Sequence, residues 1–271
     1  MEVSRCIYLT KEEEISDFYE RTFNTEGHTQ LELHPNEYIF VGNEVYCYQD
    51  DFIRRVNYNT IDSEYSGTIK PRNIEQIAAI DMLQDRTSKV KVLRGVYGSG
   101  KDYLMINAAL SLVEDGTYDK IVFVRPNLTL KNMPSIGALP GDENDKLGWT
   151  LAPLYDKVGG RAGLDYLVAN NKLEMVPLLF IRGRSFENSI IYVTEAQNID
   201  VEIAKLLLGR VGENSELWLN GDNHQTDSRI FDINNGLSAM VNRLIDEELF
   251  AYVYLPKTER SNVANLANLL D

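Results

Sequence analysis

Residues 90 to 101 read Val90-Lys91-Val92-Leu93-Arg94-Gly95-Val96-Tyr97-Gly98-Ser99-Gly100-Lys101, and this stretch decides the fold of the 271-residue chain. Val90 to Leu93 is a short β-branched and apolar run, which is typical of a buried strand. Gly95 to Lys101 fits the pattern G-x-x-x-x-G-K, and a helical pattern follows from about Asp102 to Val113. The sequence therefore predicts a strand, a phosphate-binding loop and a helix in direct succession.

The chemistry of this loop follows from its residue types. Glycines let the backbone wrap closely around phosphates, and the amides at the start of the following helix attract an anion. We expect Lys101 to bridge the terminal phosphates of ATP. Tyr97 packs against the loop or lines the nucleotide pocket, and the sequence leaves both open. The loop residues expected to hold the nucleotide are Gly95, Tyr97, Gly98, Ser99, Gly100, Lys101 and Asp102.

A glycine-rich turn with a surface lysine is the alternative interpretation of this motif alone. The rest of the chain after Pro71 favours the phosphate loop, because further short apolar runs alternate with helical segments. The strands expected there are Ile121–Val124, a strand near Met175–Phe180, Ile190–Val193, Leu217–Leu219 and Tyr252–Leu255. Such runs predict an α/β fold whose mainly parallel sheet is covered on both faces.

The first 65 residues have a different texture. A helical stretch from Lys11 to Thr22 precedes two alternating runs, Tyr38–Val41 and Val45–Tyr48, which predict a β-hairpin. This part holds 14 acidic and 5 basic residues, against 27 and 22 in the remainder. We expect a small acidic region at residues 1–65 and a nucleotide-binding domain at residues 66–271.

Composition limits the classes of function. No apolar run approaches the roughly 20 residues of a membrane helix, and no signal pattern opens the chain, so we expect a soluble, cytoplasmic protein without a membrane partner. Cys6 and Cys47 lie far apart in the sequence, and we expect two inert thiols. A net charge of -14 repels polyanions, so any nucleic-acid site must be a local basic patch.

Two positions around the expected metal site depart from the usual pattern. Asp102 stands where a Ser or Thr hydroxyl normally follows the lysine. Thr194 stands where the strand Ile190–Val193 would normally lead into Asp-Glu, and Glu195 follows it. The hydroxyl and the carboxylate of ordinary P-loop enzymes hold the same Mg²⁺. The two residues look exchanged, which predicts either a retained Mg²⁺ site formed by Asp102 and Thr194 or a site that binds nucleotide with poor turnover.

The order of the remaining motifs resembles the PhoH family of ATPases, over about residues 71 to 271. The motif Gly221-Asp222-Asn223-His224-Gln225 is similar to the G-D-x-x-Q motif of superfamily 1 helicases. The other motifs that carry the resemblance are Arg72–Gln76, Val124–Pro126, Gly137–Asp142, Pro153–Asp156, Ile181–Phe186 and Glu195–Asn198. Residues 36–41 resemble the connector strand of PIN–PhoH fusions, and we expect no PIN nuclease domain.

The resemblance implies a RecA-like P-loop core that binds and hydrolyses ATP, with RNA or single-stranded nucleic acid as partner. It also implies a homo-oligomer, with a hexameric ring as the expected form. It implies that Gln76 reads the adenine edge, although a surface helix residue is the alternative. Glu195 would orient the attacking water, Gln225 would sense the γ-phosphate, and Arg260 would stabilise transition-state charge. His224 fills a variable position of its motif.

The basic residues expected to contact nucleic acid are Arg125, Lys131, Arg182 and Arg184. Arg182 and Arg184 have the alternative role of neutralising neighbouring acids. Three functions stay open at this point. The first is a nucleic-acid-dependent ATPase with helicase-like action, and the second is an ATP-binding oligomeric switch or scaffold with impaired hydrolysis. A nucleotide kinase is the third, but the G-D-x-x-Q motif has no natural role in one.

Overall fold

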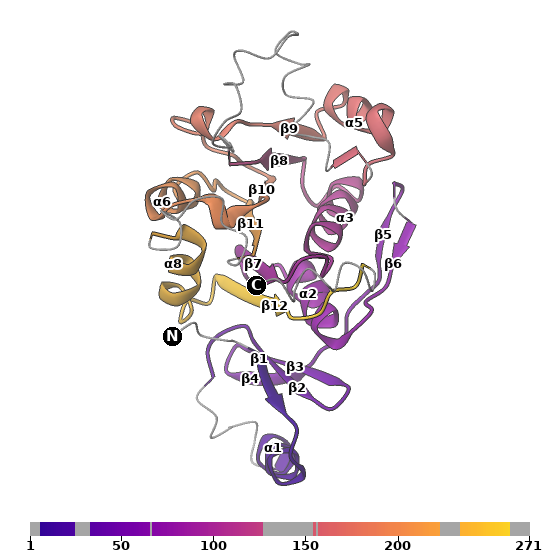
Figure 1. Ribbon diagram of the computed structural model, residues 1–271, viewed down its shortest axis with the longest axis vertical. Helices are drawn as coiled ribbons and strands as arrows, with labels where there is room; N and C mark the ends of the chain where they lie inside the picture. The colour runs from indigo at the N-terminus through magenta and orange to yellow at the C-terminus, as the bar shows by residue number, and fades with distance from the viewer. Residues whose placement is uncertain are drawn as a thin grey trace.

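The computed structural model describes residues 6–24, 33–65, 67–126, 154–155, 157–222 and 234–260. Its centre is a six-stranded sheet in which every pair of neighbouring strands is parallel. The strand order is β12-β7-β11-β10-β8-β9, so the strands of Figure 1 follow one another from β9 down to β12. The strands are β7 (Val90–Gly95), β8 (Lys120–Val124), β9 (Leu173–Met175), β10 (Ser189–Val193), β11 (Glu216–Gly221) and β12 (Phe250–Leu255). This arrangement confirms the predicted α/β fold with a P-loop core.

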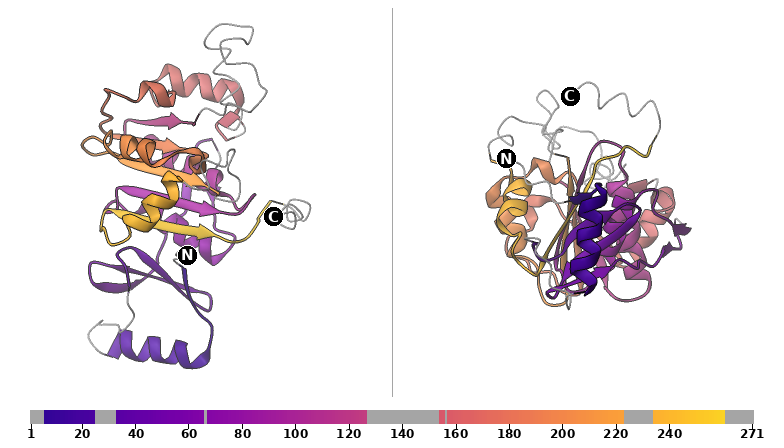
Figure 2. Two further views of the ribbon diagram at one scale, coloured as in Figure 1. Left: turned by 60° about the vertical axis from the view of Figure 1, so that its left-hand side comes forward. Right: turned by 90° about the horizontal axis from the view of Figure 1, so that it is seen from below.

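Helices cover both faces of this sheet. Successive side chains of a strand point to opposite faces, and here both sets are apolar. On β10, Tyr192 packs toward the helices α2 (Ile74–Gln84), α3 (Lys101–Glu114) and α5 (Gly160–Ala169), and Val193 packs toward α6 (Val201–Leu208) and α8 (Gly236–Arg243). Figure 2 shows the two helical layers. The strands therefore read as continuous apolar runs because neither face meets water.

The N-terminal part forms a four-stranded sheet below the core (Figure 2). Its elements are β1 (Cys6–Leu9), α1 (Glu12–Asn24), β2 (Glu37–Val41), β3 (Glu44–Gln49) and β4 (Phe52–Arg55). One face packs on α1 through Phe18 and Ile39, and the other joins the core cluster through Phe40 and Cys47. The hairpin predicted within this region is confirmed as β2 and β3.

Polar contacts also join the N-terminal sheet to helix α2 of the core. Asp81 on α2 accepts a hydrogen bond of 2.8 Å from Tyr38 and pairs with Arg54 at 2.7 Å.

A second hairpin follows, formed by β5 (Ile61–Ser63) and β6 (Gly67–Ile69), and β5 contacts α3. The boundary expected between residues 65 and 66 falls inside this hairpin, and the division into two regions stays a prediction.

One expected strand was placed wrongly. The strand near Met175–Phe180 ends at Met175, because Val176 donates the last ladder bond, to Phe123, and Pro177 has no N–H to donate. Residues Leu178–Phe180 form the 3-10 helix η2. The other strands expected in the core and both predicted helices are present within a few residues of the expected bounds. Across the described residues, we find no helix long and apolar enough to cross a membrane.

Candidate nucleotide-binding site

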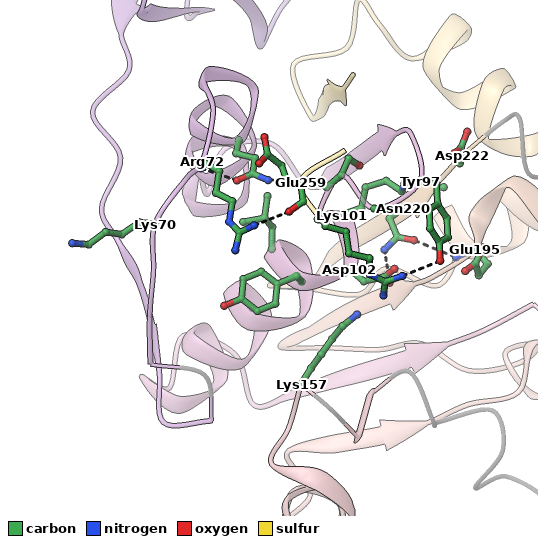
Figure 3. Close-up of a pocket in the computed structure, with 18 residues that line it drawn as sticks. Lys70, Arg72, Tyr97, Lys101, Asp102, Lys157, Glu195, Asn220, Asp222 and Glu259 are labelled. Carbon is green, nitrogen blue, oxygen red and sulfur yellow. Dashed lines mark hydrogen bonds between the residues drawn. The ribbon is translucent and has the colours of Figure 1, made fainter. Parts of the chain in front are cut away.

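A cavity of about 720 Å³ opens beyond the carboxyl ends of β7, β10 and β11. Parallel α/β sheets bind their ligands at this edge, because the loops and helix N-termini meet there. Figure 3 shows side chains from the P-loop, the start of α3, the turn after β10, the end of β11 and the residues after β12 around it. The lining residues are Lys70, Arg72, Gln76, Tyr97, Gly98, Ser99, Gly100, Lys101, Asp102, Tyr103, Leu104, Lys157, Glu195, Asn220, Gly221, Asp222, Glu259 and Arg260.

The loop between β7 and α3 has the shape that its glycines predict. Gly98 and Gly100 adopt φ values of 69° and 94°, where a side chain would be strained. A Cβ at Gly95 would lie 2.6 Å from the carbonyl oxygen of Leu255, so the loop starts tightly against β12. The amides in the first turn of α3 have no acceptor within the helix, which leaves them for an anion.

Lys101 lies over this loop. Its Nζ donates to the carbonyl oxygens of Gly95 at 2.7 Å and Val96 at 2.9 Å. Burial lowers the pKa of Lys101, against the opposing charges of Asp222 and Asp102. The ammonium is thus held at the cleft by neutral carbonyls, which it can exchange for the stronger bonds to phosphate oxygens.

Residues after β12 brace the outer side of the loop. Thr258 Oγ1 donates to the carbonyl oxygen of Tyr97 at 2.7 Å. The amide of Glu259 donates to the carbonyl oxygen of Gly98 at 2.9 Å. Arg260 donates to the Tyr97 hydroxyl at 2.9 Å, with its guanidinium 5.5 Å from the ring centre. Arg260, expected from the sequence to act at the phosphates, therefore lines the cleft in contact with Tyr97.

Gln76 is a buried helix residue that connects α2 to the loop. Its Nε2 donates to the carbonyl oxygen of Ser99 at 3.0 Å, and its Oε1 accepts from the amide of Arg72 at 2.9 Å. The cap residue Asn73 accepts from the Gln76 amide and fixes the start of α2. The structure brings Gln76 to the cleft, and its role toward adenine stays a prediction.

Asp102 and Thr194 are in direct contact. Asp102 Oδ1 accepts hydrogen bonds from Thr194 Oγ1 at 2.9 Å, from the Tyr192 hydroxyl at 2.6 Å and from Asn220 Nδ2 at 2.8 Å. Burial alone would raise the pKa of this carboxyl, but the charge of Lys157 and these three donors lower it below its ordinary value. The carboxylate is therefore held ionised inside the cleft.

Glu195 stands at the turn that follows β10. It adopts a left-handed backbone conformation with φ of 54°, and its amide donates to Asn220 Oδ1 at 3.2 Å. Gln197 Nε2 donates to its Oε2 at 2.7 Å. Gln197 also accepts from the amide of Asp222, so the ends of β10 and β11 form one connected group of polar residues.

Among the described residues, the three basic residues predicted to contact nucleic acid, Arg125, Arg182 and Arg184, do not line this cleft. Arg184 pairs with Glu174 at 2.6 Å and covers the ring of Phe186, which favours the acid-neutralising alternative for it. Arg182 is exposed, and Arg125 lies just beyond the end of β8. The predictions for Lys131 and Gln225, and the position of His224, lie outside the described residues.

Lys157, Asn220 and Asp222 line the cleft but were absent from the expected set of site residues, and so was Tyr192, which donates to Asp102. Asn220 and Asp222 flank Gly221 at a strand end, a position that could have singled them out. Tyr192 lies two residues before Thr194, so the two share a face of β10. No pattern in the sequence points to Lys157.

The loop, the half-buried Lys101 and the parallel sheet define a P-loop nucleotide-binding protein. The family model for PhoH-like proteins matches residues 68–267. The chain belongs to the PhoH family, whose members are generally ATP-binding P-loop proteins.

Curated relatives bear the same family name. The chain is 36% identical over 215 residues to protein PhoH2 of Bacillus subtilis, an alignment that covers 76% of this chain and 48% of that protein. It is 34% identical over 209 residues to protein PhoH2 of Mycolicibacterium smegmatis, and this alignment covers 76% of this chain and 47% of that protein. Protein PhoH of Escherichia coli K12 is 29% identical over 203 residues, covering 73% and 56%. The chain thus spans about half the length of these relatives.

Proposed function

We propose that this chain is a Mg²⁺-dependent ATPase of the cytoplasm that acts on, or is regulated by, RNA or another single-stranded nucleic acid, and that works as a homo-oligomer, with a hexameric ring as the expected form. The observation that carries the proposal is the convergence of Lys101 and Glu195 on one cleft. A cation for the phosphates and a carboxylate for the attacking water are the two groups that phosphoryl transfer requires most directly.

The other cleft residues take roles that match their positions. The first-turn amides of α3 and Lys101 hold the phosphates, and Gln76 contacts the adenine edge. Glu195 orients water and accepts its proton, while Arg260 leaves Tyr97 to stabilise charge on the phosphates. Gln225 completes the set as the proposed γ-phosphate sensor.

The residues around Asp102 fit a Mg²⁺ ion. All three hydrogen bonds that Asp102 accepts from described residues go to Oδ1, which leaves Oδ2 for a metal. Thr194 adds a hydroxyl beside it. Among the described residues no group of three or more His, Cys, Asp or Glu could hold a metal by itself, so phosphate oxygens and water supply the remaining ligands. When bound, Mg²⁺ neutralises charge that develops on the phosphates.

A phosphate-release assay tests this function. The natural chain is expected to release phosphate from ATP as Mg²⁺ is titrated, and Lys101→Ala is expected to abolish release. Glu195→Gln keeps the shape of the side chain but not the base, so it should bind ATP and lose at least about a hundredfold in rate. Equal rates for the natural chain and Glu195→Gln would contradict the assigned role.

The double exchange Asp102→Thr with Thr194→Asp is the matched comparison for the metal site. It should retain turnover, because one carboxylate and one hydroxyl remain. The single change Thr194→Asp places a second carboxylate at hydrogen-bond distance from Asp102, and it should lose turnover. If natural chain and double exchange both bind ATP without releasing phosphate, the proposal of hydrolysis fails.

A second candidate is an ATP-binding switch or scaffold with impaired hydrolysis. The observation that favours it is the set of three hydrogen bonds that Asp102 accepts from Tyr192, Thr194 and Asn220, called the clasp below. The clasp ties the carboxylate to the core sheet. A carboxylate held in this way can serve structure alone. Binding of ATP that changes the oligomeric state, measured by light scattering, without phosphate release would favour this candidate.

The nucleic-acid part of the proposal rests on one exposed patch. Phe180 of η2 is 67% exposed and Leu179 is 77% exposed, and the exposed Arg182 follows them. Exposed aromatic rings beside a cation suit stacked bases and a phosphate backbone. Single-stranded RNA should stimulate phosphate release, and Phe180→Ala and Arg182→Ala should reduce the stimulation. Only monomers in the presence of ATP would count against the ring.

A further inference from the structure

Lys157 lines the cleft without a role in the proposed function. It lies between residues Leu154–Tyr155 and helix α5, in a part of the chain that carries no nucleotide motif. Figure 3 shows its side chain extending from the turn toward Asp102 at the start of α3. A lysine from a separate segment thus approaches the residue next to Lys101.

The backbone that carries Lys157 is firmly placed. Leu154 and Val158 on either side of it are 2% and 0% exposed and belong to the main apolar core. The amides of Lys157 and Val158 both donate to the carbonyl oxygen of Leu154, at 2.9 and 3.1 Å. Gly163 of α5 packs so closely that a Cβ there would lie 1.6 Å from the carbonyl oxygen of Val158. The position of this turn is therefore set by packing.

The negative charge of Asp102 accounts for a lysine at position 157. An ordinary P-loop has a neutral hydroxyl where this chain has Asp102, so here the negative charge of the pair formed with Thr194 stands directly after Lys101, at the start of α3. Like charges a few ångströms apart repel strongly when water is partly excluded. Lys157 lines the same cavity as Asp102 and its side chain extends toward it (Figure 3), so its ammonium is placed to offset this carboxylate.

We propose that Lys157 is a second phosphate-binding cation, which offsets Asp102 in the free protein and contacts the terminal phosphates of a bound nucleoside triphosphate together with Lys101. This inference rests on the proposed nucleotide binding. It assigns a positioning and affinity role to a residue outside every nucleotide motif of the sequence. It also explains how the site accepts a triphosphate beside Asp102.

Calorimetric binding measurements test this role on the whole chain. The ligands are ATP, ADP and inorganic tripolyphosphate, each with Mg²⁺ and with a chelator. Lys157→Met keeps the length of the side chain and removes the charge, and Lys157→Arg keeps the charge. Lys172→Met is the control, because Lys172 is also a partly exposed lysine next to α5 but does not line the cleft. Thermal melting checks that each variant folds.

The expected result is an ATP affinity about tenfold lower for Lys157→Met, a smaller loss for ADP, and near-natural affinity for Lys157→Arg and Lys172→Met. The added change Asp102→Ser should recover much of the loss, because the charge that Lys157 offsets is gone. A purely structural Lys157 would show neither the ATP preference nor this recovery.

The outcomes separate the two proposals. If the natural chain binds ATP and a folded Lys157→Met binds it equally well, the role of Lys157 is overturned while nucleotide binding stands. If tripolyphosphate binding depends on Lys157 but ATP does not bind, the phosphate site is supported and the nucleotide function fails. If the natural chain binds neither ligand, both proposals are refuted.

Discussion

Glu216→Gln is predicted to destabilise the sheet that supports the P-loop. Glu216 at the start of β11 and Lys91 on β7 are both 0% exposed, and their charged atoms lie 2.7 Å apart. The same two strands end at the cleft, where β7 leads into the P-loop and β11 leads to Asn220. The pair therefore fixes the opposite ends of the strands that carry the site.

The magnitude follows from what glutamine can and cannot replace. Besides Lys91, the carboxylate accepts from Tyr118 at 2.6 Å, from Trp218 at 2.8 Å and from Arg86 at 3.3 Å. Glutamine has nearly the same shape, and the Tyr118 hydroxyl can turn to accept from its amide. The ammonium of Lys91 loses its counter-charge in a dry interior, and breaking a buried pair in this way costs roughly 3–5 kcal/mol. We expect about 3 kcal/mol, at the lower end of this range, because the glutamine oxygen and the carbonyl oxygen of Asp85 remain as neutral acceptors for Lys91.

Urea unfolding followed by far-ultraviolet circular dichroism measures this loss without relying on Trp218 fluorescence. With a slope of about 3 kcal/mol per molar urea, the midpoint should fall by about 1 M. Lys91→Met with Glu216→Gln is the matched control, because it removes the orphaned ammonium and keeps the acceptor. Its midpoint should return most of the way to the natural value. A Glu216→Gln midpoint within about 0.2 M of the natural one would refute the argument.

Further predictions concern titration and the clasp on Asp102. Burial lowers the pKa of Lys91 to about 8, against the opposing charge of Glu216. The unfolded chain then binds more protons between pH about 8 and about 10.4, so the Lys91 contribution rises with pH across this window. The stability of the natural chain relative to Lys91→Met should rise there, as denaturant midpoints would show; a pH-independent difference would contradict it. Burial raises the pKa values of Cys6 and Cys47 to about 11 and 12, so both thiols should resist alkylation at pH 8 in the folded chain and react in urea. Tyr192→Phe removes one of three donors to Asp102 and should cost about 1–3 kcal/mol of stability, with a rise in the pKa of Asp102 detectable by NMR; an unchanged carboxyl titration would count against the clasp.

Sequence reasoning predicted the fold because the decisive signals are local. Strands buried on both faces read as apolar runs, and the G-x-x-x-x-G-K loop fixed the order of strand, loop and helix. The predicted strand near Met175–Phe180 failed for a local reason as well. Val176 to Ile181 is apolar throughout, but the loss of the N–H at Pro177 ends the ladder, and Leu179 and Phe180 turn outward.

The site was predictable only where a motif names the residue. Gln76, Lys101 and Glu195 do meet at one cleft, as the motif order implied. Lys157 was not predictable, because its approach depends on how the turn before α5 packs. The buried Lys91 and Glu216 pair was hidden for a similar reason: a charged residue near a strand end reads as an exposed one, and only the packing of Tyr118 and Trp218 shows otherwise.

The hydrogen bond between Asp102 and Thr194 shows how the fold brings the two apparently exchanged residues together. They lie 92 positions apart, and in the sheet β11 stands between β7 and β10. The first turn of α3 therefore has to reach across the end of β11 to meet β10, and Asn220 at that end bonds to both residues. Thr194 donates to an oxygen of Asp102, so the two side chains form one pair. This pair consists of one carboxylate and one hydroxyl, which are the same groups, with the same charge, as in an ordinary P-loop site. The exchange therefore leaves the charge of the pair unchanged and alters only which of the two positions carries it.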